Sequence, residues 1–203
     1  AGRAATLGLA TTGLSELYAD PAVTWLRARG VDVRLGTPVT RFVVRGGRLE
    51  AVEVRGGELI ATPSCVSTLP PAALSRLELP LPGLDRFESS PILSINLWLD
   101  RSVSEIADFD FAGLLSGSVQ WIFNRERMLG GKAHNLAAVI SAARSFVEQD
   151  NESLVAMAWR DIQEHLPAAR GSRVVRSLVV RERNATFAST VAAEPLRPGP
   201  KSP

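Results

Sequence analysis

The segment from Gly30 to Pro71 reads GVDVRLGTPVTRFVVRGGRLEAVEVRGGELIATPSCVSTLPP and decides how the first part of the chain folds. Two alternating runs, Pro38–Arg45 and Arg48–Arg55, each end at a Gly-Gly pair. Gly-Gly between alternating runs favours a tight hairpin turn, because such turns need residues with positive φ. The segment therefore predicts a β-meander. Shorter strands are expected at Val31–Leu35, Glu58–Ala61 and Cys65–Thr68.

A helix of about nine residues is predicted directly before this meander, over Pro21–Arg29. Asp20 can accept hydrogen bonds from the free N–H groups of a first helical turn, and Pro21 suits the first helical position. Gly30 then follows as a residue that can end the helix in a left-handed conformation. A second, short helix is expected after the meander, at Ala72–Leu77.

A proline-rich connection between Leu79 and Pro91 indicates a domain boundary. Beyond it, a helix is predicted over Asn151–Leu166, where apolar residues recur at helical spacing and Asp150 can cap the first turn. Residues 103–118 read as a loop. Apolar or alternating runs predict strands at Ile92–Leu99, Ser118–Asn124, Asn135–Ala143 and Arg173–Arg181.

Composition excludes several classes of function. The net charge is only +2 and arginines are spread along the chain, so no nucleic-acid footprint is expected. The single cysteine, Cys65, allows neither an internal disulfide nor a thiolate metal site, and two histidines give no zinc set. We therefore expect no metal. No apolar run reaches the roughly 18 residues that a spanning helix needs.

The motifs of nucleophilic and dinucleotide chemistry are incomplete. GxGxxG is absent, and the Gly-Gly pairs stand between strands rather than before a helix. Gly113–Gly117 reads GLLSG, in which Ser116 comes one place later than a nucleophile elbow requires. His165, at the end of the predicted helix, is interpreted as a favourable partner of the helix dipole.

Aromatic residues on the predicted strands carry more information. Trp121 and Phe123 share one strand face, and Trp98 lies on another strand. They are interpreted either as core residues or as the wall of a deep apolar pocket for a hydrocarbon, with Asn124 and Arg125 at its polar mouth. Both interpretations stay open at this point.

Several segments together resemble a known family. They are GLSELYADPAVTWLRARGVDVRLGTPVTRFVV, VSTLPPAAL, SPILSINLWLDR, QWIFNR, VISAAR and RNATF. Their combination is similar to the squalene-associated FAD-dependent desaturases, a group within the amine oxidase and phytoene desaturase superfamily. The likeness runs over residues 7–203, and NLWLDR with QWIFNR points to the squalene branch.

The resemblance implies a mixed α/β and α+β fold. Residues 1–78 would be the middle portion of a Rossmann-like FAD-binding domain of the glutathione-reductase type. Residues 79–182 would form an antiparallel-sheet substrate domain, and 183–203 would return to the FAD domain. The family's dinucleotide fingerprint and its Gly-Asp segment near the flavin have no counterpart here. The resemblance therefore implies an internal piece of a longer chain.

The resemblance also implies a function. It is that of an FAD-dependent oxidoreductase acting on a C30 isoprenoid, in which hydride from the reduced flavin converts hydroxysqualene to squalene. The backbone of Val39 would hold the adenine of FAD, since a peptide group offers a donor and an acceptor without charge. Catalytic residues are not assigned. A cytoplasmic protein that contacts an apolar isoprenoid is expected, with peripheral membrane contact left open.

Two alternatives stay open within and outside this fold. One is a carotenoid (phytoene-type) desaturase or a flavin amine oxidase. The other belongs to another class, a non-catalytic α+β binding module that is complete in itself.

Overall fold

The structure is a computed structural model that describes residues 8–77, 79, 81, 83–130, 133–197 and 199. The chain divides into two units. We call them the sheet unit, which is Pro91–Arg183 with the described residues up to Val31, and the meander unit, which is Asp32–Ser90 with the described residues from Asn184 onward.

In this division the described residues up to Val31 fall with the sheet unit rather than with the meander. The three predicted segments refer to the domains of a longer flavoenzyme and stay a prediction. The predicted boundary at residue 78 and the last residues of the predicted return segment lie outside the described residues.

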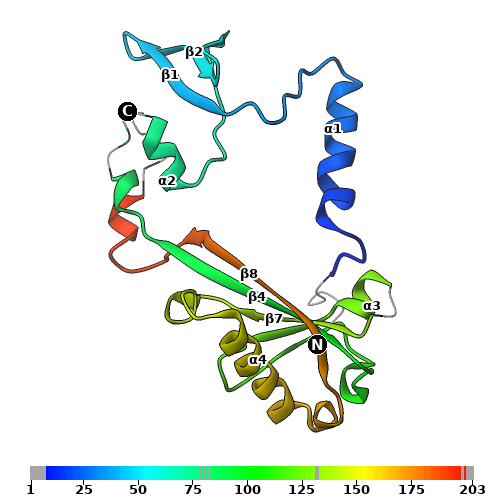
Figure 1. Cartoon of the computed structure of the whole chain (residues 1–203). Helices are drawn as coiled ribbons and strands as arrows, with labels where there is room; N and C mark the ends of the chain where they lie inside the picture. Colours follow the sequence, from blue (N-terminus) through cyan, green and yellow to red (C-terminus); the bar gives the residue numbers. More distant parts are fainter. Residues whose placement is uncertain are drawn as a thin grey trace, which may run out of the picture. The chain divides into compact units, whose positions relative to one another are not determined.

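The meander unit is built on the predicted hairpins. Its strands β1 (Val39–Arg45), β2 (Arg48–Val54) and β3 (Leu59–Ala61) pair antiparallel in the order β1-β2-β3 (Figure 1). Gly46 and Gly47, between β1 and β2, have φ of 54° and 75°, the left-handed conformation that the turn requires. The predicted short helix is α2 (Pro71–Leu74), which continues as a 3₁₀ turn.

Two predicted strands of this region are wrong. Val31–Leu35 and Cys65–Thr68 have no strand conformation. A strand needs a neighbour to satisfy its N–H and C=O groups, and within the described ranges neither segment pairs with another. A run of apolar residues was therefore not enough to make either segment a strand.

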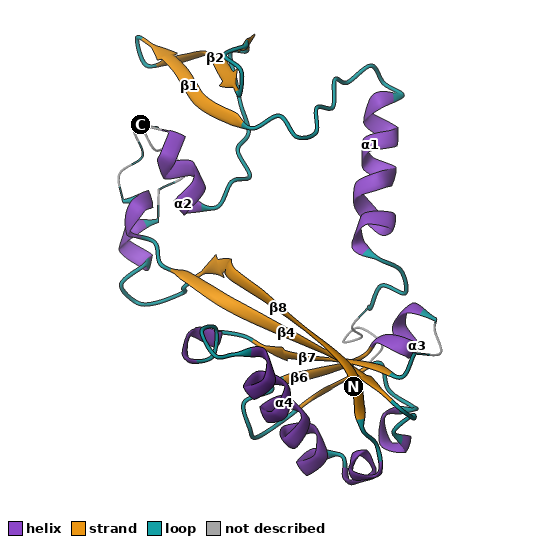
Figure 2. Cartoon of the chain, in the orientation of Figure 1, coloured by secondary structure: helices purple, strands orange, loops and turns teal. Residues whose placement is uncertain are grey.

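The sheet unit holds the other α-helices and strands, apart from the first two residues of one strand and the last four of another. Its helices are α1 (Asp20–Arg27), α3 (Arg125–Leu129) and α4 (Asn151–His165). Over the described residues, its strands form one sheet in the order β5-β6-β7-β4-β8 (Figures 1 and 2). The strands are β4 (Ser89–Leu99), β5 (Phe111–Gly113), β6 (Trp121–Asn124), β7 (Asn135–Ile140) and β8 (Val174–Phe187).

β5 and the end of β8 correct the prediction. Residues 103–118 were expected to be loop, and the last predicted strand was expected to end at Arg181. Instead, Phe111–Gly113 pairs with β6, and β8 continues to Phe187. Both segments alternate too briefly to stand out in the sequence, and each is a strand because a neighbour supplies its hydrogen bonds.

The hydrophobic core lies between α4 and one face of this sheet (Figure 2). Alternation in β4 points every second residue inward, and the alternating buried and half-buried pattern runs along its whole length. Each fully buried Leu or Ile contributes about 1.5–3 kcal/mol. The most deeply buried members are Leu93, Ile95, Leu97, Ile122, Leu136, Ile140, Leu154 and Ile162.

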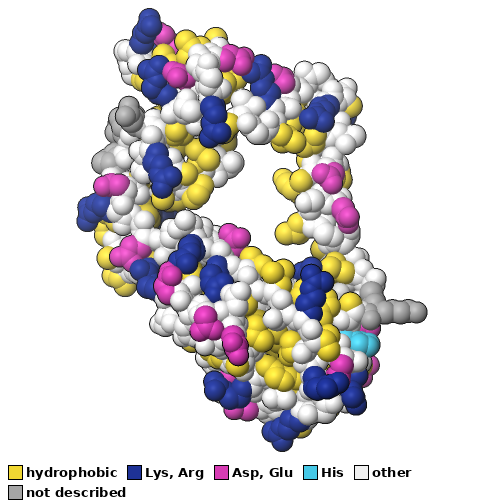
Figure 3. Space-filling view, viewed as in Figure 1, with side chains coloured by type: hydrophobic (Ala, Val, Ile, Leu, Met, Phe, Trp, Pro, Cys, Tyr) yellow, Lys and Arg dark blue, Asp and Glu magenta, His cyan; other side chains and the backbone are white. Residues whose placement is uncertain are grey.

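α1 forms where the sequence predicted a helix, with Pro21 in its first turn and Gly30 at φ 75° after its end. No residue of α1 is buried. Hydrophobic side chains are exposed along it and along the turn before it, among charged ones (Figure 3). The helix therefore forms from local features at its two ends, and none of its side chains is fully buried.

Within the part of the chain that the structure describes, no helix is long and apolar enough to cross a lipid bilayer.

Candidate functional site

An aromatic surface lies on the face of the sheet opposite the core. Ile122 of β6 is fully buried in the core, so its neighbours Trp121 and Phe123 point to the other face. Phe111 lies directly across from Phe123 in the β5–β6 ladder and therefore shares that face. Trp98 reaches the same face from β4, between the core residues Leu97 and Leu99. We call Trp98, Phe111, Trp121 and Phe123 the aromatic surface.

The rings of β5 and β6 pack against one another. The ring centroids of Phe111 and Trp121 lie 5.7 Å apart, and those of Phe111 and Phe123 lie 6.1 Å apart and nearly parallel. Such separations are typical of favourable aromatic pairs. Trp121 nevertheless keeps 41% of its surface exposed, so the cluster presents apolar area outward.

Small side chains separate this cluster from β4. Phe123 pairs with Ala137 of β7, which pairs with Asn96 of β4; in the next row, Trp121 pairs with Val139, which pairs with Ser94. In these two rows of this face, large rings therefore lie over β6 and smaller side chains over β7 and β4. This arrangement suits a hydrocarbon better than a charged substrate.

Arg176 adds a charge at the β8 side of the surface. Its guanidinium carbon lies 4.7 Å from the ring centroid of Trp98, a cation–π geometry. The start of β8 is fixed by Asp100, whose carboxylate accepts from the backbone N–H of Arg173 at 2.9 Å. That hydrogen bond lowers the pKa of Asp100, with a further contribution from the Arg173 side chain.

The structure brings Trp98, Trp121 and Phe123 to one face, but it does not bring Asn124 there. Asn124 is buried on the core side, where its amide donates to the carbonyl of Ile106 at 2.8 Å. Its side-chain oxygen caps α3 by accepting from the N–H of Arg127 at 3.1 Å. Arg125, the next residue, is the exposed first residue of α3.

Phe111 and Arg176 were not found by reading the sequence. The signal for Phe111 was its alternation with Phe109 before Gly113, which is too short to define a strand alone. Arg176 gave no signal, because its stacking depends on how β8 pairs with β4.

Val39 lies at the start of β1, the edge strand of the meander sheet. Arg55 N–H donates to Pro38 O, whereas Val54 N–H donates away from β1 to Glu58 O. Successive residues of a strand point their backbone groups to opposite sides, so the N–H and C=O of Val39 face away from β2. The ladder is also irregular between Val39 and Arg41. A donor and an acceptor that face outward from a sheet edge fit the edge of an adenine ring.

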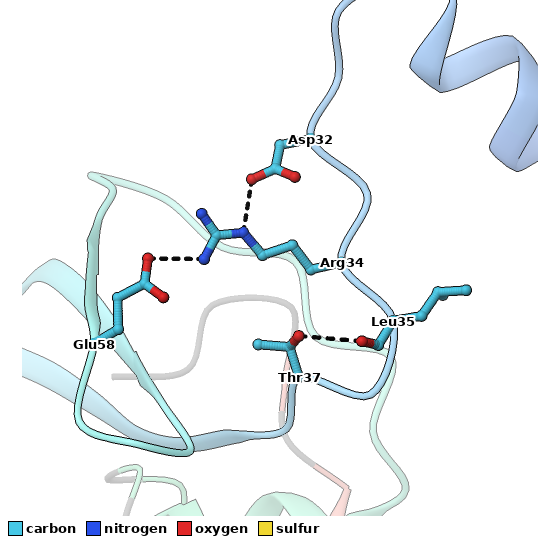
Figure 4. A network of polar contacts seen from close by, with 5 residues as sticks. All are labelled: Asp32, Arg34, Leu35, Thr37 and Glu58. Atoms are coloured by element: carbon cyan, nitrogen blue, oxygen red, sulfur yellow. Dashed lines mark hydrogen bonds and ion pairs between the residues drawn. The ribbon is translucent and has the colours of Figure 1, made fainter.

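An ion-pair network holds the segment that leads to Val39 (Figure 4). The Arg34 guanidinium contacts Glu58 at 2.8 Å and Asp32 at 2.7 Å, and both carboxylates raise the pKa of Arg34, Glu58 the more strongly. Thr37 Oγ donates to the carbonyl of Leu35 at 3.2 Å. These groups are exposed, so the network fixes geometry more than it stabilises the fold.

The meander unit also carries a groove of about 120 Å³. Phe87 and Phe187 meet edge to face in its wall, with centroids 5.9 Å apart. Pro70 and Pro71 line it, and Arg76 supplies a cation. Its mostly apolar lining suits an aromatic or aliphatic group.

The family model for flavin containing amine oxidoreductases matches residues 2–203, and the chain belongs to this family. The chain is 30% identical over 212 residues to hydroxysqualene dehydroxylase of Rhodopseudomonas palustris, covering 98% of this chain and 45% of that protein. It is 24% identical over 210 residues to 15-cis-phytoene desaturase of Synechococcus elongatus, covering 93% of this chain and 44% of that protein. The chain thus spans less than half the length of these curated relatives.

Solved structures share the fold. An oxidoreductase from Methanosarcina mazei matches with a TM-score of 0.63 at 16% identity, over 81% of this chain and 41% of that one. Putrescine oxidase bound to putrescine matches with a TM-score of 0.60 at 17% identity, over 80% of this chain and 38% of that one. The predictions of the family, of a mixed fold with antiparallel sheets, of an oxidoreductase family and of FAD as cofactor are confirmed.

Proposed function

We propose that the protein containing this chain is an FAD-dependent oxidoreductase that reduces hydroxysqualene to squalene. The aromatic surface carries the proposal: Trp98, Trp121 and Phe123 lie on one face of the sheet, and Trp121 is exposed there. A C30 hydrocarbon has no group to pair with charged residues, so its binding rests on apolar contact of this kind. The curated relative from Rhodopseudomonas palustris is named for this reaction.

When bound, FAD would supply the hydride chemistry of this reaction. The chain's own residues bind and orient the cofactor and the isoprenoid. The outward-facing N–H and C=O of Val39 hold the adenine, and the Arg34 network keeps the preceding segment in place. The aromatic surface holds the isoprenoid and excludes water from it. Arg125, exposed at the end of β6, is a polar contact for the substrate; Asn124 is not, because both ends of its amide are engaged.

A carotenoid desaturase is the second candidate, since a 15-cis-phytoene desaturase matches most of this chain. The two reactions move electrons in opposite directions. A dehydroxylase oxidises reduced flavin, whereas a desaturase reduces oxidised flavin. Both substrates partition into lipid, which favours peripheral contact of a cytoplasmic protein with a membrane.

The test uses the full-length protein with FAD bound. Photoreduced enzyme is mixed without oxygen with hydroxysqualene, and the flavin absorbance and the squalene formed are followed. Re-oxidation of the flavin with one squalene per flavin supports the proposal. Reduction of oxidised flavin by phytoene, with no reaction toward hydroxysqualene, overturns it in favour of a desaturase.

Variants connect the reaction to this chain. Trp121→Ala and Phe123→Ala are expected to raise KM for the isoprenoid about tenfold, from the loss of apolar contact area. Leu129→Ala is the control, because Leu129 is also 41% exposed but lies on α3. Val39→Pro removes the backbone N–H and is expected to weaken FAD binding, whereas Val39→Ala keeps it.

A further inference from the structure

A serine and a histidine meet in the sheet unit, away from the aromatic residues. Ser116 lies in the connection between β5 and β6, and His165 is the last residue of α4. Ser116 Oγ is 3.0 Å from His165 Nε2, although 49 residues separate them in sequence. Ser116 is exposed and His165 is half-buried, so a reagent can reach the hydroxyl group.

The second ring nitrogen of His165 determines what the pair can do. His165 Nδ1 is 2.8 Å from the backbone carbonyl oxygen of Asp161. A carbonyl oxygen only accepts, so Nδ1 must carry the hydrogen. In the neutral ring Nε2 is then unprotonated and accepts the hydroxyl hydrogen of Ser116. This is the tautomer that a general base needs beside a nucleophilic serine.

The loop that carries Ser116 is fixed in place by Asp161. The carboxylate of Asp161, 3% exposed, accepts from the backbone N–H groups of Ser118 and Val119 at 2.6 and 2.9 Å. Gly117 has φ 88°, which turns the chain between Ser116 and these two amides. Among the described residues, no group accepts from the backbone N–H groups of Ser116 and Gly117. They are therefore available to an anion that forms beside Oγ.

We propose that Ser116 and His165 form a nucleophile–base dyad that accepts an acyl group from an activated carboxylic ester, an activity separate from the flavin reaction. Ser116 Oγ bonds to the acyl carbon while its proton passes to His165 Nε2. The ester C–O bond breaks, and the leaving alcohol takes that proton. Water then attacks the acyl carbon, the bond to Oγ breaks, and a carboxylic acid leaves as the proton returns to Oγ. The sequence is a net hydrolysis and needs no oxidant. Asp161 is a positioning residue.

A fluorophosphonate probe tests the dyad directly. The folded chain is incubated with the probe, the adduct is followed by intact mass, and its position is found by peptide sequencing. The expected result is one adduct, on Ser116. His165→Gln is expected to slow its formation about 100-fold, a typical contribution of a general base. Ser118→Ala, in the same loop, is expected to label as the wild type, because Ser118 contributes its backbone N–H.

Two further measurements test the dyad on the wild-type chain, so that the result does not depend on whether a variant folds. Wild-type chain unfolded in urea must lose the preference for Ser116, which shows that the fold creates the reactivity. p-Nitrophenyl acetate must give a burst of about one nitrophenol per chain, as an acyl-enzyme does, and Ser116→Ala must abolish it. A folded wild type without an adduct on Ser116, equal labelling in urea, or no burst overturns the proposal.

Discussion

The carboxylate of Asp161 accepts a hydrogen bond of 2.6 Å from the backbone N–H of Ser118, across 43 residues of sequence. The same oxygen accepts from Val119 N–H at 2.9 Å. Asp161 is almost fully buried on α4. The contact therefore joins the core helix to the connection between β5 and β6, whose strands carry Phe111, Trp121 and Phe123.

Removing this carboxylate should destabilise the sheet unit. Asp161→Ala leaves two N–H groups without an acceptor, at a cost of about 1–3 kcal/mol in the free energy of unfolding. Asp161→Asn keeps one acceptor oxygen and should cost less. Urea unfolding followed by circular dichroism measures both. Asp108→Ala, at an exposed aspartate, should stay within about 0.5 kcal/mol; equal effects at the two positions would contradict the role of Asp161.

Gly117 and Gly130 make a matched pair of glycines with positive φ, 88° and 66°. A Cβ at Gly117 would lie 2.8 Å from Asp161 Oδ2, whereas nothing lies within 4 Å of one at Gly130. Gly130→Ala should cost about 1–2 kcal/mol from backbone strain alone. Gly117→Ala should cost a further ~1–3 kcal/mol from the collision.

A double variant tests whether a Cβ at position 117 and the Asp161 carboxylate collide. In Gly117→Ala with Asp161→Ala, the colliding carboxylate is gone, so the double variant should lose less stability than the two single variants added together. Strict additivity, or equal costs at Gly117 and Gly130, would show that no collision occurs.

Trp121 and Ile122 are neighbours on β6, and their substitution by Ala should lower the stability to very different extents. Ile122→Ala opens a cavity in the core and should cost about 2–5 kcal/mol of stability. Trp121→Ala removes only half-exposed contacts with Phe111 and should cost about 1 kcal/mol or less. Chemical denaturation of the two variants beside the wild type measures both effects. A large loss of stability with Trp121→Ala would mean that this ring is core rather than binding surface.

Asp150 should make the stability of α4 sensitive to acid. Its carboxylate accepts from Ser153 N–H at 2.8 Å and from Ser153 Oγ at 2.7 Å, and the backbone bond lowers the pKa of Asp150 most. Because the folded pKa is below the unfolded value of about 3.9, this contribution is present above that value and is lost as pH falls through the folded pKa.

The comparison with Asp150→Asn isolates this effect, since Asn also caps a helix but does not titrate. Urea midpoints measured from pH 7 down to pH 3 should show the wild type losing its advantage over the variant at the acidic end. Parallel curves for the two proteins would exclude the cap as the source of the acid sensitivity.

The sequence predicted the elements that local chemistry determines. The Gly-Gly turns gave β1 and β2, and Asp150 with its helical spacing gave α4 to within a residue. Alternation also placed Trp121 and Phe123 on one face, as the burial pattern shows. These features depend on residues that are close together in the sequence, so they can be predicted from the sequence alone.

Other features depend on partners far along the chain. The segments Val31–Leu35 and Cys65–Thr68 are apolar enough for strands, but no described strand lies beside them. The use of Asn124 as a cap requires Ile106 and Arg127 in place, and Ser116 meets His165 only after α4 docks. Contacts between residues so far apart in the sequence cannot be predicted from the spacing of those residues.

The bare surface of α1 has a consequence for how the chain melts. None of its eight residues is fully buried, and helices this short are marginal in water without packing. Amide hydrogens in α1 should therefore exchange with solvent far sooner than those of α4, whose apolar side is in the core. Trp25, 55% exposed, should fluoresce at the long wavelengths of a hydrated indole already in the folded chain.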